Sequence, residues 1–199
     1  MRIGVLGGTF DPPHIGHLIV AQDAWSALGL ERVLFVPAAV PPHKRGVAIT
    51  PAEVRLAMVE AACADDPRFE ACDLEIRRGG TSYTVDTLRA LKERDPRGAL
   101  FFLLGADQFR DIHKWRSPLE LARLAELVVL SRPGYPIEEP KIEIPYRRLD
   151  VTCVDISATE IRRRVSAGEP IRYLVPGAVE AIIRAHGLYG APRVVGESV

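Results

Sequence analysis

The fold of this chain is set by Gly7-Gly8-Thr9-Phe10-Asp11-Pro12-Pro13-His14-Ile15-Gly16-His17-Leu18. The apolar run from Ile3 to Leu6 precedes this stretch and is short enough to form one buried parallel strand. Apolar residues then recur at spacings of three and four, which is typical of one face of a helix: Leu18, Ala21, Trp25 and Leu28. We therefore expect a strand, a glycine turn, and a helix with two histidines in or just before its first turn.

This turn has the chemistry of a phosphate site. The first turn of a helix presents unpaired backbone N–H groups and a partial positive charge, and both favour a phosphate. The imidazoles of His14 and His17 can donate further hydrogen bonds to phosphoryl oxygens, or act as acid or base near neutral pH. Alternatively, the glycines only make a tight turn and the histidines only cap the helix. The spacing of the two histidines beside two glycines favours the phosphate site.

The composition is that of an ordinary globular domain. The chain has 199 residues, of which 47% are hydrophobic and 26% charged, and this is enough for a real core. Lys+Arg and Asp+Glu are both 26, so the net charge is zero and no general affinity for nucleic acid is indicated. The sequence leaves a homo-oligomer open.

The cysteines and the N-terminus favour a cytoplasmic protein. The cysteines are odd in number and too widely spaced for a disulfide framework or a metal site: Cys63, Cys72 and Cys153. The N-terminal apolar run is too short for the core of a signal peptide. No stretch approaches the length of a membrane span, so we expect no membrane partner.

Strands and helices alternate along the chain, which predicts an α/β fold with a doubly wound parallel sheet. Besides the first strand, we expect strands over residues 32–37, 72–77, 99–104, 127–130 and 149–154. The strand over residues 99–104 is the most apolar and is expected to lie at the centre of the sheet. Further helices are expected after Thr50, up to Arg94, through Trp115, over residues 117–125, after Ser157, and from Pro176 to His186.

Two helix starts carry the pattern of a capping box, Thr50 with Glu53 and Ser157 with Glu160. The helix after Thr50 is expected to bury one apolar face: Val54, Ala57, Met58 and Ala61. Two glycines are placed to end helices: Gly29 and Gly187.

Three segments are expected to meet in one cleft. In open α/β sheets, ligands bind beyond the carboxyl ends of the strands, near the point where the strand order reverses. The opening stretch, Gly105-Ala106-Asp107 and the turn at Ser157 all follow predicted strands. The sequence therefore predicts a single active site built from these three segments.

The opening stretch resembles the GxFxPxHxGH signature of a nucleotidyltransferase superfamily, and each fixed position is present: Gly8, Phe10, Pro12, His14, Gly16 and His17. The segment Ile156-Ser157-Ala158-Thr159-Glu160-Ile161-Arg162 resembles the second signature, ISxTxIR. A capping box and a hydrophobic staple between Ile156 and Ile161 explain most of the second segment without any function. The capping box and the staple do not explain Thr159 and Arg162. Because the first signature is also present, we expect these two residues to belong to the site.

Further segments resemble the bacterial nicotinate-nucleotide adenylyltransferases, and the resemblance runs from Met1 to about Tyr189. These segments are Ser82 to Leu88, Leu104 to Phe109, Lys114-Trp115, Pro42-His43-Lys44 and Arg132 to Tyr135. The resemblance implies a Rossmann-like nucleotidyltransferase fold that condenses ATP with nicotinate mononucleotide, giving deamido-NAD and pyrophosphate, with Mg²⁺. It also implies one domain over residues 1–190, in which residues 157–190 are a helical part that completes the ATP site. Residues 191–199 are expected to be a loose tail.

The resemblance also implies residue roles. The catalytic residues would be His14, His17, Lys44 and Arg162. ATP would contact Gly7, Gly8, Thr9, Phe10, His14, His17, Gly105, Asp107, Arg132, Ile156, Ser157, Thr159 and Arg162. Nicotinate mononucleotide would contact Lys44, Thr84 and Trp115. His17 is assigned to the α-phosphate, His14 to the ATP phosphates, Lys44 to phosphate near the transfer point, and Arg162 to the β- and γ-phosphates.

The acceptor phosphate is an adequate nucleophile at pH 7, so direct in-line attack without a covalent intermediate is expected. No cluster of Asp, Glu and His has the spacing of a metal site built by the protein, so Mg²⁺ would be carried mainly by the ATP phosphates.

Several alternatives stay open at this level. Trp115 could be a core or interface aromatic, while Asp107 and Arg132 could form surface ion pairs, and residues 38–49 could be a solvated loop. Within the same fold, the chain could be a phosphopantetheine adenylyltransferase or, with less resemblance, a cytidylyltransferase. It could also be a nucleotide-binding regulator without catalysis, although His14, His17 and Arg162 are all retained.

Overall fold

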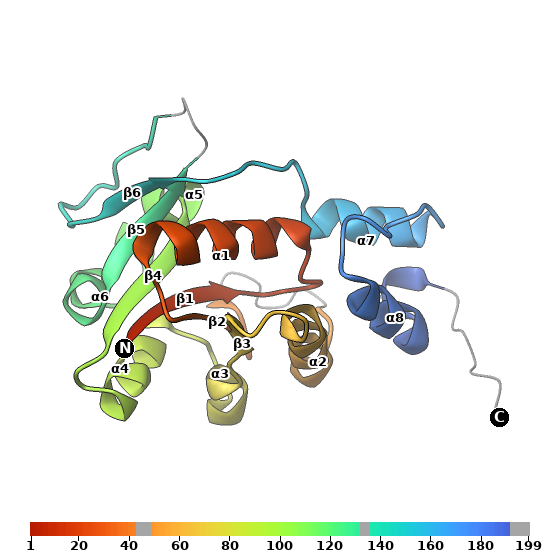
Figure 1. Cartoon of the computed structure of the whole chain (residues 1–199), viewed down its shortest axis with the longest axis horizontal. Helices are drawn as coiled ribbons and strands as arrows, with labels where there is room; N and C mark the ends of the chain where they lie inside the picture. The colour runs from red at the N-terminus through yellow and green to blue at the C-terminus, as the bar shows by residue number, and fades with distance from the viewer. Residues whose placement is uncertain (43–48, 132–135, 192–199) are drawn as a thin grey trace.

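The computed structural model describes residues 1–42, 49–131 and 136–191, and its centre is a six-stranded sheet (Figure 1). The strands are β1 (Arg2–Gly8), β2 (Arg32–Pro37), β3 (Phe69–Ala71), β4 (Ala99–Gly105), β5 (Glu126–Ser131) and β6 (Arg147–Asp150). Their order in the sheet is β3-β2-β1-β4-β5-β6, and each neighbouring pair is parallel. The predicted doubly wound α/β fold is confirmed, and β4 lies beside β1 at the centre as expected.

Helices connect the strands on both faces of the sheet. They are α1 (Ile15–Leu28), α2 (Ala52–Cys63), α3 (Leu74–Arg78), α4 (Thr84–Arg94), α5 (Ala106–Arg110), α6 (Pro118–Leu124), α7 (Ala158–Ser166) and α8 (Gly177–His186). Two short 3₁₀ turns are η2 (Ile112–Lys114) and η3 (Leu188–Gly190). Within the described ranges, no helix is both long and apolar enough to cross a membrane.

Alternate residues of the strands feed two separate cores, because successive side chains of a strand point to opposite faces. On β4, Phe102 and Leu104 pack in the core formed with α3, α4, η2 and α6. Phe101 and Leu103 pack on the other face, in the core formed with α1 and α2. Both faces are therefore covered, which explains why these strands are continuous apolar runs.

A third core joins the end of the chain to α2. Met58 and Ala62 of α2 contact Ile161 of α7 and Val179 and Ile183 of α8. Figure 1 shows α7 and α8, in blue, at one side of the sheet with α8 beside α2. This contact brings the second signature to the carboxyl edge of the sheet, where the first signature lies.

The predicted strand over residues 72–77 is wrong. The third strand ends at Ala71, and Leu74–Arg78 forms the short helix α3. The buried neighbours are Leu74 and Glu75, instead of the alternating pair Leu74 and Ile76 that a strand would bury. A run this short fits either period, and the contact of Arg77 with Asp73 one turn earlier stabilises the helical form.

The predicted strand over residues 149–154 is shifted. The strand is Arg147–Asp150, and its last contact with the sheet is the Val151 N–H that donates to the Ser131 carbonyl at 3.0 Å. The next N–H, of Thr152, donates at 2.6 Å to Asp23 on α1. The chain therefore leaves the sheet and crosses toward α7.

Neither capping box forms completely. Ser157 accepts the N–H of Glu160 at 3.2 Å, but the Glu160 carboxylate pairs with Arg163 and Arg164. At the start of α2 the N-cap residue is Pro51, and no side chain caps the helix. The backbone N–H of Thr50, which Glu53 would bind in a capping box, donates to Asp11, and the Thr50 hydroxyl donates to Tyr189.

The buried face of α2 also differs from the predicted one. It consists of Arg55, Met58, Val59, Ala62 and Cys63. This face is displaced around the helix because Arg55 points inward to polar partners. The predicted glycine ends of helices at Gly29 and Gly187 are both confirmed, with φ of 59° and 60°.

Candidate active site

The site lies where the strand order reverses. The opening stretch follows β1, Gly105-Ala106-Asp107 follows β4, and these strands are neighbours whose connections leave in opposite directions along the sheet. Two cavities open at this edge. We call them the histidine cavity, lined by His14 and His17, and the tryptophan cavity, lined by Trp115.

Helix α1 begins with the two histidines in contact. His14 precedes the first helical residue, and His17 occupies the first turn, as predicted. The backbone N–H of His14 donates to Nδ1 of His17 at 3.1 Å, and the rings stack with centroids 3.7 Å apart. Because Nδ1 of His17 is an acceptor, its proton in the neutral form lies on Nε2. His17 is therefore a hydrogen-bond donor through Nε2.

Both imidazoles are neutral at pH 7 in the absence of ligand. Burial lowers the pKa of His14 to about 4, and among the described residues its Nδ1 has no hydrogen-bond partner. Burial, and then the neighbouring His14, lower the pKa of His17 to about 3. With pKa values this low, neither histidine can act as an acid or base near neutral pH in the ligand-free site. Of the two expected uses of these imidazoles, only hydrogen-bond donation fits.

The ring of Phe10 packs against His17. Phe10 is buried, and its ring meets His17 edge-on at 5.0 Å and lies 5.8 Å from the ring of Phe35. A Cβ on Gly8 would lie 3.0 Å from the ring of Phe10, so glycine lets the turn close over this ring. Phe10, expected to contact ATP, lines neither cavity.

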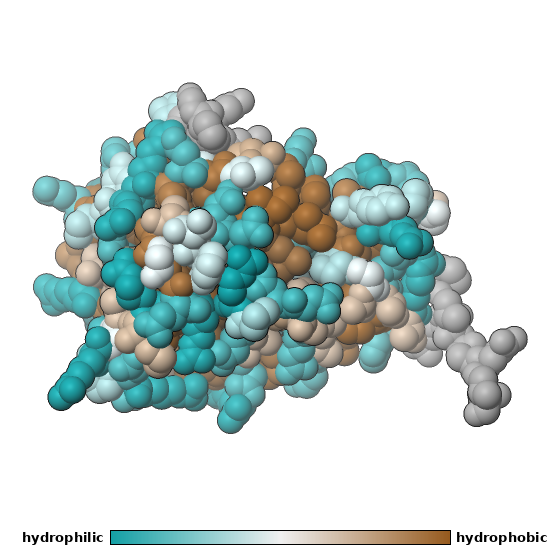
Figure 2. Space-filling model, in the orientation of Figure 1, coloured by the Kyte–Doolittle hydropathy of each residue, from teal (hydrophilic) through white to brown (hydrophobic). Residues whose placement is uncertain are grey.

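The histidine cavity has a volume of about 620 Å³ and is assembled from distant parts of the chain. It brings together five of the predicted site residues: His14, His17, Gly105, Asp107 and Ile156. Its aliphatic wall comes from α1 and from the segment after β6: Val20, Val151 and Val154. Figure 2 shows hydrophobic side chains over the N-terminal half of α1 beside this segment. Asp107 is exposed and lies 3.7 Å from Arg110, as its alternative role of surface ion pairing required.

The tryptophan cavity is smaller, about 190 Å³, and the glycine turn forms part of its lining. The predicted site residues in its lining are Gly7, Gly8, Thr9, Thr84 and Trp115. Trp115 meets the buried ring of Phe102 edge-on at 6.1 Å while it also lines the cavity. Trp115 thus contacts the core and a cavity at the same time.

Gln108 lines both cavities, so they meet at this residue. Its Oε1 accepts the backbone N–H of Gly105 at 3.2 Å. Two ligands in the two cavities would therefore approach each other beside Gln108 and the glycine turn.

Glu75 is a cavity residue that the sequence did not reveal. It is only 7% exposed, lines the tryptophan cavity, and accepts the hydroxyl of Thr87 at 2.5 Å. Arg78 donates to the same Thr87 oxygen at 3.3 Å. Nothing marked Glu75 in the sequence, because its segment fitted a strand in which it would face away from the apolar residues.

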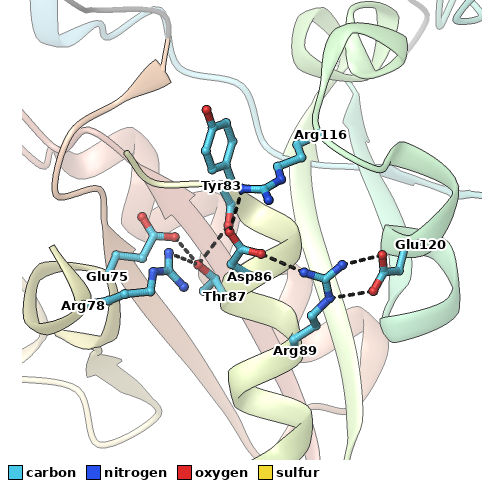
Figure 3. Close-up of polar contacts among 8 residues, drawn as sticks. All are labelled: Glu75, Arg78, Tyr83, Asp86, Thr87, Arg89, Arg116 and Glu120. Atoms are coloured by element: carbon cyan, nitrogen blue, oxygen red, sulfur yellow. Dashed lines mark hydrogen bonds and ion pairs between the residues drawn. The ribbon is translucent and has the colours of Figure 1, made fainter. Parts of the chain in front are cut away.

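An ion-pair network braces the wall of the tryptophan cavity (Figure 3). Arg89 of α4 lies between Asp86, at 2.8 Å, and Glu120 of α6, at 2.6 Å. Arg116 pairs with Asp86 at 3.4 Å and lies over the ring of Tyr83, 4.9 Å from its centroid. The network joins α4 to the segment that carries Trp115.

The second signature reaches the first through Arg162. Its Nη1 donates to the carbonyl of Asp11 at 2.8 Å, and its Nη2 donates to the Thr159 hydroxyl at 3.2 Å. Ser157 caps α7. Ser157, Thr159 and Arg162 line neither cavity, although Ile156 lines the histidine cavity.

Arg55 is a second residue that the sequence did not reveal. It is fully buried and donates to three carbonyls, of Thr9 at 2.8 Å, Thr50 at 2.9 Å and Ala39 at 3.0 Å. Burial lowers its pKa, and the carboxylate of Asp11 opposes that effect. Helical periodicity alone would place an arginine at the surface, so only these tertiary contacts identify it.

Two predicted site residues, Lys44 and Arg132, lie outside the described residues. The residues before the gap that contains Lys44 reach the tryptophan cavity, since Pro41 and Pro42 line it. The segment just before is held by the N–H of Ala39, which donates to the Ser82 hydroxyl at 2.9 Å.

Comparison with known proteins first defines the class. Residues 5–164 match the family model described as cytidylyltransferase-like. Relatives then define the family. A probable nicotinate-nucleotide adenylyltransferase of Thermus thermophilus is 52% identical over 189 residues, which cover 95% of this chain and 100% of the relative. A protein of the same description from Shouchella clausii is 44% identical over 191 residues, covering 95% of this chain and 97% of the relative.

The chain therefore belongs to the nicotinate-nucleotide adenylyltransferase family, and the resemblance found in its sequence is confirmed. Solved structures share its fold. Plasmodium falciparum nicotinic acid mononucleotide adenylyltransferase complexed with NaAD has a TM-score of 0.75 at 22% identity, covering 94% of this chain and 97% of that one. A putative nicotinate-nucleotide adenylyltransferase from Vibrio parahaemolyticus has a TM-score of 0.70 at 20% identity, covering 95% of each chain.

Proposed function

We propose that this protein transfers the adenylyl group of ATP to nicotinate mononucleotide in NAD biosynthesis, forming nicotinate adenine dinucleotide and pyrophosphate. The observation that carries the proposal is the meeting of two cavities at Gln108, one lined by the histidine pair and the other by Trp115. A reaction that joins two nucleotides through their phosphates needs such a pair of adjoining sites. The named relatives support this choice of reaction.

The tryptophan cavity is proposed to take the mononucleotide. Trp115 offers an aromatic face to the pyridine ring, which carries a positive charge that favours such a face. Thr84 is the first residue of α4, where a hydroxyl and the positive end of the helix favour the nicotinate carboxylate. Lys44 is proposed to bind phosphate at the transfer point.

The histidine cavity is proposed to take ATP, with residues 157–190 completing that side of the site. Nε2 of His17 would donate to the α-phosphate, with His14 as a further donor. The amides of Gly7 and Gly8, which line the tryptophan cavity, are proposed to donate to the phosphate oxygens that point toward that cavity. Arg162 is proposed to bind the β- and γ-phosphates through the guanidinium N–H groups that it does not donate to Asp11 and Thr159. The remaining proposed contacts to ATP are Thr9, Gly105, Asp107, Arg132, Ile156, Ser157 and Thr159.

The proposed chemistry is a single in-line displacement. An oxygen of the acceptor 5′-phosphate forms a bond to the α-phosphorus of ATP, while the bond from that phosphorus to the bridging oxygen of the β-phosphate breaks. Pyrophosphate leaves with the electron pair of that bond. The side chains need only align the two substrates and stabilise the charge that develops on the phosphoryl oxygens.

Mg²⁺ is treated as part of the nucleotide substrate. Within the part of the chain that the structure describes, no group of three His, Cys, Asp or Glu side chains could hold a metal ion. Mg²⁺ prefers oxygen ligands and retains several waters, so the phosphates of ATP suffice to carry it. It would neutralise part of the charge on the departing pyrophosphate.

A pyrophosphate-release assay with ATP and three acceptors tests the proposal. Nicotinate mononucleotide is expected to give a higher kcat/KM than nicotinamide mononucleotide, and phosphopantetheine to give no release. A preference for nicotinamide mononucleotide would overturn the assignment of the base. Release with phosphopantetheine alone would make the protein a phosphopantetheine adenylyltransferase, and ATP binding without release would favour a non-catalytic regulator.

A further inference from the structure

The last described turn of the chain folds back onto the opening stretch. Within η3, Tyr189 has a φ of 57°, a left-handed conformation that residues other than glycine rarely adopt. This conformation directs its side chain inward, where the phenol hydroxyl donates to Oδ1 of Asp11. The two residues are 178 positions apart in the sequence.

Asp11 is held on both of its carboxylate oxygens. Oδ1 accepts the hydroxyl of Tyr189, and Oδ2 accepts the backbone N–H of Thr50 at 3.2 Å. The Thr50 hydroxyl donates to the Tyr189 oxygen at 3.4 Å and closes the set of contacts. Asp11 is only 4% exposed, so water does not replace these partners.

The same residue fixes the cation of the second signature. The backbone carbonyl of Asp11 accepts Nη1 of Arg162 at 2.8 Å. Arg55, which supplies the opposite charge near Asp11, also holds the carbonyls of Thr9 and Thr50. The position of Asp11 therefore determines where the opening turn and Arg162 meet.

Tyr189 is a permanent donor in this arrangement. Burial, and then its hydrogen bond to Asp11, raise the pKa of the phenol, so the hydroxyl keeps its proton at neutral pH. Tyr189 lines neither of the two cavities. Its effect on a ligand must therefore pass through Asp11 and its neighbours.

We propose that Tyr189 is a positioning residue for ATP. Through Asp11 it holds the turn over residues 9–14 and the guanidinium of Arg162 in the arrangement that receives the triphosphate. The C-terminal turn is thus part of the active site, although it touches neither substrate. The inference rests on the proposed adenylyl transfer for its kinetic consequences, and on the contacts above for its structural ones.

The test compares Tyr189→Phe with Tyr173→Phe. Both changes remove one hydroxyl from the C-terminal part, but Tyr173 is 85% exposed and serves as the control. Tyr189→Phe is expected to lower kcat/KM for ATP about tenfold, the size expected for one hydrogen bond to a charged group. The KM for nicotinate mononucleotide is expected to change less than about twofold, and Tyr173→Phe to change neither value.

A double-mutant cycle with Arg162→Ala separates positioning from general loosening. If Tyr189 acts on ATP through Arg162, adding Tyr189→Phe to Arg162→Ala lowers kcat/KM for ATP little further. Full additivity of the two changes, or an equal loss toward both substrates, would overturn the proposal. Thr50→Val removes only the hydroxyl that donates to Tyr189, and it is expected to give a smaller shift in the same direction.

Direct binding keeps this test independent of the reaction. Titration of the parent and of Tyr189→Phe with a non-hydrolysable ATP analogue is expected to show weaker binding by the variant, with Tyr173→Phe unchanged. Absence of pyrophosphate release by the parent would count against the proposed function alone. Equal affinity of parent and Tyr189→Phe for the analogue would count against the positioning role alone.

Discussion

The two cavities at the carboxyl edge of the sheet are built in different ways. Nine of the sixteen residues that line the tryptophan cavity lie within residues 75–116, a part of the chain that a local ion-pair network braces, and the others come from residues 7–9 and 36–42. The histidine cavity is about three times as large and joins α1, the end of β4 and the segment before α7. One of its lining residues, Thr152, is held by a contact that crosses much of the chain, because its N–H donates to Asp23 on α1.

This difference has a functional meaning. A small cavity with an aromatic wall suits recognition of a single ring. A wide cavity suits a long triphosphate, whose charge must be met by donors from several elements. Changes in the tryptophan cavity should therefore affect one substrate, whereas changes behind the histidine cavity should act from a distance.

The largest expected effect lies in the histidine cavity. His17→Ala removes the Nε2 donor proposed for the α-phosphate and is expected to lower kcat by about 10²–10³, as the loss of one donor to a developing charge does. His186→Gln serves as the control, because His186 is exposed at the end of α8. Near-normal turnover of His17→Ala in the pyrophosphate-release assay would break the assignment.

The matching change in the tryptophan cavity should be smaller and confined to one substrate. Trp115→Ala is expected to raise the KM for nicotinate mononucleotide about tenfold, from the usual strength of stacking on an aromatic side chain. The KM for ATP should stay within about twofold. Trp25→Phe is the control, because Trp25 lies on α1 under Arg68, away from both cavities. A rise in both KM values would show that the cavities are not separate in function.

The histidine pair is expected to make the stability of the protein depend on pH. In the unfolded chain both histidines become protonated as the pH falls below their ordinary pKa of 6.5. In the folded protein the pKa is about 4 for His14 and about 3 for His17, so both stay neutral until the pH is much lower. The unfolded state then binds more protons, so the free energy of unfolding falls as the pH falls from 6.5 toward 4. The slope should be about 1 kcal/mol per pH unit for each buried histidine.

Denaturant unfolding at a series of pH values measures this slope. His14→Gln/His17→Gln, which cannot titrate, is expected to show a flatter dependence over the same range, while carboxylates contribute equally to both proteins. Parallel curves for the two proteins would mean that the pair is solvated enough to keep its ordinary pKa.

The smallest effect is expected in the network that braces the tryptophan cavity. Arg89→Gln breaks the contacts with Asp86 and Glu120, all of which are partly exposed, so the loss of stability should be about 1 kcal/mol or less. Thermal unfolding measures this loss, and Arg184→Gln, which breaks one exposed pair on α8, is a matched control. A large rise in the KM for the mononucleotide would show that the network also holds Trp115 in place.

Much of the fold could be predicted because local patterns were unambiguous. Apolar runs marked the central strands, and the spacing from Leu18 to Leu28 marked α1. The predictions were wrong where a pattern was short, or where tertiary contacts at the edge of the sheet determined where a strand ends. Residues 74–78 are too few to separate a strand from a helix. The chain leaves the sheet after Val151, and the next N–H, of Thr152, donates to Asp23 on α1.

The candidate site was predictable in its motifs and much less so in its supports. The sequence identified the histidine pair, Asp107 and Trp115, and the structure places each at a cavity. It could not identify Arg55, because burial of an arginine depends on three carbonyls brought there by folding. Nor could it pair Asp11 with Tyr189, since no local pattern links residues at opposite ends of a chain.

The contact between His14 and His17 has a consequence for sequence variation. The group that fixes the proton on Nε2 of His17 is the backbone N–H of residue 14, so it does not depend on which side chain stands there. Any residue except proline at position 14 would retain this donor. A substitution at position 14 would therefore remove one imidazole and its stacking on His17, while the proton of His17 stayed on Nε2.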